Sequence, residues 1–162
     1  MNNELEELYQ QVLLEHSKRP RNFGDFADEG VIHVHGDNPS CGDEIHLHVR
    51  FGKDGCVDEM KFTGQGCAIS LASASLMTLK LKGKSRMDAL ALARAFYELL
   101  TRATSASGDP GPEPLPPGFG DLSAFTGVRK FPQRVKCATL PWRAFEQAIA
   151  GATPGSGKVS TE

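Results

Sequence analysis

The chain has 162 residues, 40% of them hydrophobic, and a formal net charge of −2. This length supports one globular domain with its own core, so folding needs no disulfides. The small net charge and the absence of a Lys/Arg-rich block argue against a nucleic-acid partner and a basic membrane-binding face. The N-terminal segment lacks a signal-peptide pattern and no apolar run approaches the ~20 residues that span a bilayer, so we expect a cytoplasmic protein without membrane association.

The first predicted element is an amphipathic helix. Apolar residues recur at helical spacing after Asn2 or Asn3, either of which can cap the first turn, and Pro20 ends the pattern. The segment 19–24 that follows has the composition of a turn.

Three short strands are predicted after Gly30, where the hydrophobic period changes to two. Apolar residues alternate with polar ones over 32–35 and 44–51, a turn follows at 52–55, and a third strand continues to about residue 62. This pattern predicts an α+β fold, in which a small three-stranded antiparallel sheet carries helices on one face. Four of the five histidines lie on the polar side of the first two strands, which suggests a metal site, but we favour a solvated face because alternation alone places polar residues there.

Helices dominate the second half of the chain. One is predicted directly after Cys67, a second runs from Ser85 to about Ala103, and a last one covers about 134–150. The stretch 104–120 is rich in Pro and Gly and is interpreted as a flexible insertion. Residues 1–150 thus form a single domain, and 151–162 are expected to be a disordered tail.

Three of the four cysteines stand where thiol chemistry is favoured. Cys41 lies in a Pro/Gly turn, Cys67 opens a helix, and Cys137 lies in the first turns of the last helix. Turns and helix N-termini lower the pKa of a thiol. Together with Asp43 they offer three sulfurs and one oxygen, a set that suits a tetrahedral Zn²⁺ site. The competing interpretation is that they are small buried hydrophobic residues. Cys56 is interpreted as structural or incidental.

The motifs around these residues resemble a known family. They are RPRNFG at 19–24, GDNPSCGD at 36–43, GQGCAIS at 64–70, ASAS at 72–75 and KCATL at 136–140. In this order they resemble the IscU/NifU N-terminal family of iron–sulfur cluster assembly proteins, from the first helix to the last. Three departures from scaffold-type members indicate the SufU-type branch: Lys136 in place of His, the segment FPQRV at 131–135 in place of LPPVK, and the insertion at 104–120.

The resemblance implies an IscU/SufE-like fold and a zinc site formed by Cys41, Asp43, Cys67 and Cys137. It also implies a partner, a pyridoxal-phosphate-dependent, SufS-like cysteine desulfurase, whose persulfide sulfur the chain accepts and passes to a downstream iron–sulfur scaffold. In the family picture a desulfurase histidine replaces Cys41 on zinc and the freed thiol attacks the persulfide, so Cys41 is the catalytic candidate. A zinc-dependent sulfurtransferase is favoured over a non-enzymatic role. Lys136 either steers the persulfide or is an exposed helix lysine.

Two other functions are consistent with the same residues. A scaffold would assemble and transfer a [2Fe-2S] cluster, or bind iron, on Cys41, Cys67 and Cys137, with Asp43 favouring release. Lys136 weakens this interpretation because it stands where a fourth iron ligand would be. A purely structural zinc module is disfavoured because such sites normally use four Cys or His ligands.

Overall fold

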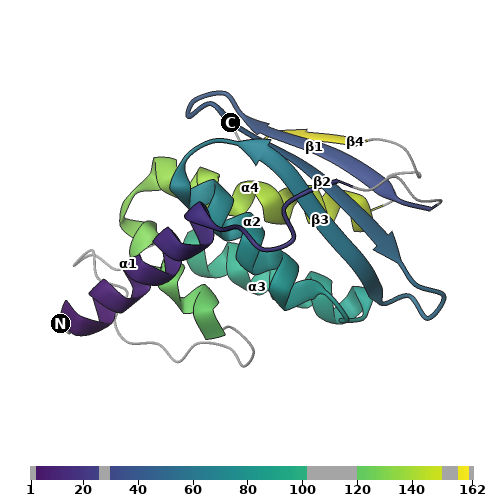
Figure 1. Ribbon diagram of the computed structural model, residues 1–162, viewed down its shortest axis with the longest axis horizontal. Helices are drawn as coiled ribbons and strands as arrows, with labels where there is room; N and C mark the ends of the chain where they lie inside the picture. Colours follow the sequence, from purple (N-terminus) through teal and green to yellow (C-terminus); the bar gives the residue numbers. More distant parts are fainter. Residues whose placement is uncertain (1–2, 26–29, 102–119, 151–156, 161–162) are drawn as a thin grey trace.

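The computed structural model describes residues 3–25, 30–101, 120–150 and 157–160 (Figure 1). In chain order the elements are α1 (Asn3–Lys18), β1 (Ile32–Asn38), β2 (Asp43–Phe51), β3 (Val57–Gln65), α2 (Ala68–Leu81), α3 (Arg86–Thr101), the 3-10 helix η1 (Gly120–Lys130), α4 (Pro132–Ile149) and β4 (Gly157–Ser160). None of the helices in the described ranges is long and apolar enough to cross a membrane.

The predicted three-stranded antiparallel sheet is confirmed. β1 pairs with β2 and β2 with β3, both antiparallel, and the helices pack against one face of the sheet (Figure 1). The apolar residues of β2 on that face, Ile45, Leu47 and Val49, are fully buried. The fold is therefore α+β, with one buried and one partly exposed face of the sheet.

A fourth strand corrects one expectation about the tail. Gly157–Ser160 form β4, which pairs in parallel with β1, so the sheet order is β3-β2-β1-β4. Without β4, β1 would be an edge strand with unpaired backbone groups, and β4 pairs with them. The expected disorder is therefore wrong for these four residues. Residues 151–156 and 161–162, and the predicted insertion from 104 to 119, lie outside the described residues.

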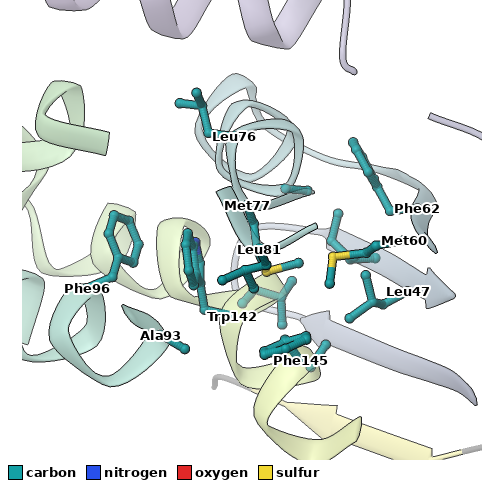
Figure 2. Close-up of a cluster of buried hydrophobic side chains, with 14 of the residues drawn as sticks. Leu47, Met60, Phe62, Leu76, Met77, Leu81, Ala93, Phe96, Trp142 and Phe145 are labelled. Atoms are coloured by element: carbon teal, nitrogen blue, oxygen red, sulfur yellow. The ribbon is translucent and has the colours of Figure 1, made fainter. Parts of the chain in front are cut away.

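The core lies between the sheet and the helices and is centred on Trp142 (Figure 2). Its ring stacks on Phe96 at a centroid distance of 4.6 Å. Its indole N–H donates to Ser73 Oγ at 2.9 Å, and that hydroxyl donates to the carbonyl of Ala138. Burying a large apolar side chain contributes ~1.5–3 kcal/mol, so this cluster fixes α4 against α2. α4 continues through Pro141 without a break.

The RPRNFG motif at 19–24, which follows α1, is linked to α2 by hydrogen bonds. The hydroxyl of Ser75 lies 2.7 Å from Nδ1 of the buried His16 and accepts the backbone N–H of Arg21 at 2.8 Å. The side chain of Asn22 donates to Thr78 Oγ1 at 3.0 Å. The segment predicted as a turn therefore has a structural role as a connector that is bound to the core.

Candidate metal centre

Cys41, Asp43, Cys67 and Cys137 meet at one end of the sheet. The potential ligand atoms of Cys41, Asp43 and Cys137 all lie within 4.8 Å of one another. Cys67 joins them through Asp43, whose Oδ2 is 3.8 Å from Cys67 Sγ. The structure thus brings together side chains from the β1–β2 turn, the start of α2 and the second turn of α4, separated by up to 96 residues in sequence.

The turn that carries Cys41 is tight. The N–H of Cys41 donates to the carbonyl of Asn38 at 3.1 Å, and Gly42 follows in the left-handed region with φ of +71°. An L side chain rarely adopts that backbone conformation. Gly42 therefore allows the chain to reverse so that Asp43 opens β2 beside the thiol.

Asp43 is held by the start of α2. It is 2% exposed, and its Oδ1 accepts the backbone N–H of Cys67 at 2.8 Å. A Cβ at Gly66 would collide with that same oxygen. The glycine before Cys67 is thus required for the close approach, and Oδ2 is left facing the thiols.

The thiols of Cys67 and Cys137 form an unequal pair. A hydrogen bond from Cys137 lowers the pKa of Cys67 to about 6, and the backbone N–H groups of Ser70 and Ile69 at the start of α2 act in the same direction against the effect of burial. The same hydrogen bond, together with burial, raises the pKa of Cys137, which is fully buried. The hydrogen bond thus favours the thiolate form of Cys67 and the thiol form of Cys137.

Two further residues belong to the site and were not predicted. The exposed guanidinium of Arg134 lies beside both thiols, and the negative charge of Cys67 raises its pKa. Asn38 is fully buried, and its Nδ2 is 3.8 Å from Cys137 Sγ. Helical spacing could have indicated Arg134, which precedes Cys137 by three residues and so shares its face of α4.

Lys136 and Cys56 lie apart from the thiols. Lys136 is exposed whereas Cys137 is buried, and consecutive helical residues point about 100° apart, so Lys136 flanks the site. Cys56 forms an isolated backbone β-bridge with Ser85. It directly precedes Val57, the first residue of β3, whereas the candidate metal site lies near the last residue of that strand. Its pKa is raised by burial and by the nearby Asp54.

The donor set fits a divalent zinc ion. In a tetrahedral Zn²⁺ site with Zn–S bonds of about 2.3 Å and Zn–O bonds of about 2.0 Å, a sulfur and an oxygen lie roughly 3.5 Å apart. Cys67 Sγ and Asp43 Oδ2 are 3.8 Å apart, and the ligand atoms of Cys41, Asp43 and Cys137 lie within 4.8 Å of one another. A nearly buried carboxylate among three thiols is costly without a positive charge close by. Cys41, Asp43, Cys67 and Cys137 would therefore hold the ion, and Asn38 and Arg134 would surround it.

The fold and site define a class of protein: small α+β domains in which three cysteines and an aspartate form a candidate metal site. The chain belongs to the NifU-like N-terminal domain family, whose sequence model matches residues 8–138. It is 41% identical to the zinc-dependent sulfurtransferase SufU of Bacillus subtilis (strain 168), over 92% of this chain and 94% of that protein. It is 44% identical to the iron–sulfur cluster assembly scaffold protein IscU of Streptococcus pyogenes serotype M1, over 91% of this chain and 86% of that protein.

A solved structure agrees with these relatives. The crystal structure of a putative iron–sulfur cluster assembly scaffold protein for the SUF system from Fervidobacterium islandicum AW-1 superposes with a TM-score of 0.67 at 30% identity, covering 88% of this chain and 97% of that one. The resemblance seen in the sequence is therefore confirmed. The protein is an iron–sulfur cluster assembly protein of the SufU/IscU type, acting as a scaffold or in sulfur transfer.

Proposed function

We propose that this protein is a zinc-dependent sulfurtransferase that accepts persulfide sulfur from a pyridoxal-phosphate-dependent cysteine desulfurase and passes it on for cluster assembly. The observation that carries the proposal is the convergence of three thiols and one nearly buried carboxylate. A labile oxygen ligand suits a site that must release a thiol, whereas a structural zinc site normally uses four Cys or His ligands. The relative from B. subtilis is named a sulfurtransferase, which supports the same proposal.

Cys41 is the proposed acceptor. It is half-buried in a turn, whereas Cys137 is fully buried in α4 and Cys67 is held at the start of α2. A desulfurase persulfide can reach a turn residue without the opening of a helix. Zinc, when bound, supplies charge that keeps the thiols deprotonated in bonds that exchange readily.

The transfer step balances without an added oxidant. The thiolate of Cys41 attacks the outer sulfur of the desulfurase persulfide and forms a new S–S bond. The bond between that sulfur and the desulfurase cysteine breaks, and its electron pair leaves on the desulfurase thiolate. Arg134, exposed beside the thiols, would attract the anionic persulfide.

The test is alanine release by the cognate desulfurase with cysteine and reductant present. Zinc-loaded wild type is expected to stimulate release strongly, whereas apoprotein and Cys41→Ala are not. Cys56→Ala is the matched control, because it removes a thiol outside the site, and it should stimulate like wild type. If zinc-loaded wild type leaves the rate unchanged, sulfur transfer is excluded.

A second candidate function is a [2Fe-2S] scaffold on Cys41, Cys67 and Cys137, favoured by the relative from S. pyogenes that is named a scaffold. Anaerobic reconstitution with iron and sulfide separates the two. On a scaffold, Asp43→Ala should retain a cluster with visible absorption longer than wild type does. On a transfer protein the same variant should hold no cluster and only bind zinc more weakly.

A further inference from the structure

The partly exposed face of the sheet carries an ordered ladder of ligand-type side chains. Across β1 and β2 three pairs lie opposite one another: His33 with His48, His35 with His46, and Asp37 with Glu44. The alternation by itself favours a merely solvated face. Alternation explains why these side chains are polar, but it does not explain why their donor atoms converge.

Three of these side chains bring their donor atoms close together. The rings of His35 and His46 are stacked, with a centroid distance of 4.5 Å and an interplanar angle of 3°. Their Nε2 atoms lie 3.0 and 3.1 Å from the same atom, Oε1 of Glu44. The ligand atoms of all three residues fall within 4.8 Å of one another, and each side chain is about one-third to one-half exposed.

We propose that His35, Glu44 and His46 form a second metal site that binds a divalent first-row transition ion. Two imidazoles and one carboxylate are ligands suited to Zn²⁺, Fe²⁺ or Co²⁺, and not to the softer Cu(I). Bonds of about 2.0–2.1 Å to a tetrahedral ion place donor atoms about 3.3 Å apart, close to the two nitrogen–oxygen distances here. Three protein ligands leave a coordination position for water or another molecule.

Two buried polar atoms on this face, which lack hydrogen-bond partners in the described residues, support the binding of a cation over simple ion pairs. His46 makes a hydrogen bond with Glu44, but the equally close His35 Nε2 is enclosed and has no partner with hydrogen-bond geometry in the described chain. Oδ1 of Asp37, directly opposite Glu44, is likewise enclosed without a hydrogen-bond partner there. Like charges directly opposite across two strands are destabilising, and an ion held at Glu44 would offset that repulsion.

The proposed site is separate from the thiols. Asp43 and Glu44 are consecutive in β2, so their side chains point to opposite faces of the sheet. Asp43 is nearly buried with the thiols, whereas Glu44 is partly exposed with the histidines. The inference does not depend on the proposed sulfur transfer, since its ligands include no sulfur.

The experiment is a titration of the full chain, already loaded with one equivalent of Zn²⁺, with Co²⁺. We expect a second equivalent to bind and give visible d–d absorption without the near-ultraviolet charge-transfer band of cobalt–thiolate bonds. His35→Gln and Glu44→Gln should each weaken this binding by at least ~10-fold. His33→Gln, which changes a histidine on the same face outside the triad, should leave it unchanged.

A measurement on the wild type covers the case in which a variant does not fold. Bound Co²⁺ is paramagnetic, so the ring resonances of His35 and His46 should broaden before that of His16, which lies buried between α1 and α2. The proposal is overturned if no second equivalent binds, if all variants bind it equally, if cobalt–thiolate absorption accounts for the uptake, or if His16 broadens together with the two ligands.

Discussion

The carboxylate of Asp43 accepts the backbone N–H of Cys67 at 2.8 Å, across 24 residues of sequence. This bond joins the first residue of β2 to the residue that caps α2, and it leaves the second carboxylate oxygen facing the thiols. The same residue thus serves as an anchor of backbone structure and as a proposed ligand. Substitutions at or beside it should therefore change metal affinity and stability together.

Gly66→Ala should weaken the site by steric displacement. The new Cβ would collide with Asp43 Oδ1 and come within 2.9 Å of Ser70 Oγ. We expect a loss of about 2–3 kcal/mol in the free energy of unfolding and a clearly weaker zinc affinity, measured by urea denaturation and by competition with a chromophoric chelator. Gly55→Ala is the matched control, because Gly55 also has positive φ, at +84°, but open space around it. Equal zinc affinity in both variants would refute the steric explanation.

Arg134→Ala should slow sulfur transfer more than Lys136→Ala. The guanidinium lies beside Cys67 and Cys137, whereas Lys136 is exposed and flanks the site. A positive charge at the rim raises the association rate with an anionic persulfide by ~10-fold or more at low salt. The measurement is the stimulation of the desulfurase as a function of ionic strength. The difference in stimulation between wild type and Arg134→Ala should become smaller as the salt concentration rises. A larger loss in Lys136→Ala would assign the steering role to the lysine instead.

The residues of the candidate site could be selected from the sequence because each of them stands in a short motif that favours thiol chemistry. Cys41 and Cys67 stand in glycine-containing turns, and such turns are visible as motifs without a structure. The alternation over β1 and β2 likewise identified the buried face of the sheet. The convergence of segments 96 residues apart was inferred from donor chemistry and from family resemblance, since spacing alone does not establish it.

Other features could not be read from the sequence. β4 is a four-residue segment without a hydrophobic pattern, and its pairing with β1 depends on an available strand edge. Asn38 and Arg134 contribute through contacts across elements, with Asn38 reaching a thiol 99 residues away. The nitrogens of His35 and His46 both lie close to one oxygen of Glu44 only because of the register of β1 against β2. A period-two pattern does not fix that register.

Acidification should destabilise the metal-free protein through two histidines, in addition to the Cys67 thiol, whose pKa is lowered to about 6. Burial is the main cause that lowers the pKa of His16 below the ordinary value of 6.5, and burial is also the main cause that lowers the pKa of His48. The unfolded chain then binds more protons than the folded one, so their contribution is present above pH ~6.5 and is lost as the pH falls through the lowered folded values. Urea denaturation of reduced apoprotein between about pH 7.5 and 5 measures this slope. His16→Gln and His48→Gln should each flatten it, and an unchanged slope in both would assign the acid sensitivity to other groups.

Ser73→Ala should destabilise the core without touching the thiols. Its hydroxyl accepts the Trp142 indole N–H and donates to the Ala138 carbonyl, and all three residues are fully buried. Removing it leaves the buried indole N–H without a partner, which costs about 1–3 kcal/mol, whereas the Ala138 carbonyl keeps its place in the hydrogen bonding of α4. We expect a loss of about 1–3 kcal/mol in urea denaturation, with a change in the fluorescence of Trp142, the single tryptophan. Ser17→Ala, which removes only an exposed hydroxyl bonded to the carbonyl of Leu14, is the control and should cost less than about 0.5 kcal/mol. Equal losses in the two variants would mean that the buried hydroxyl does not link α2 to α4.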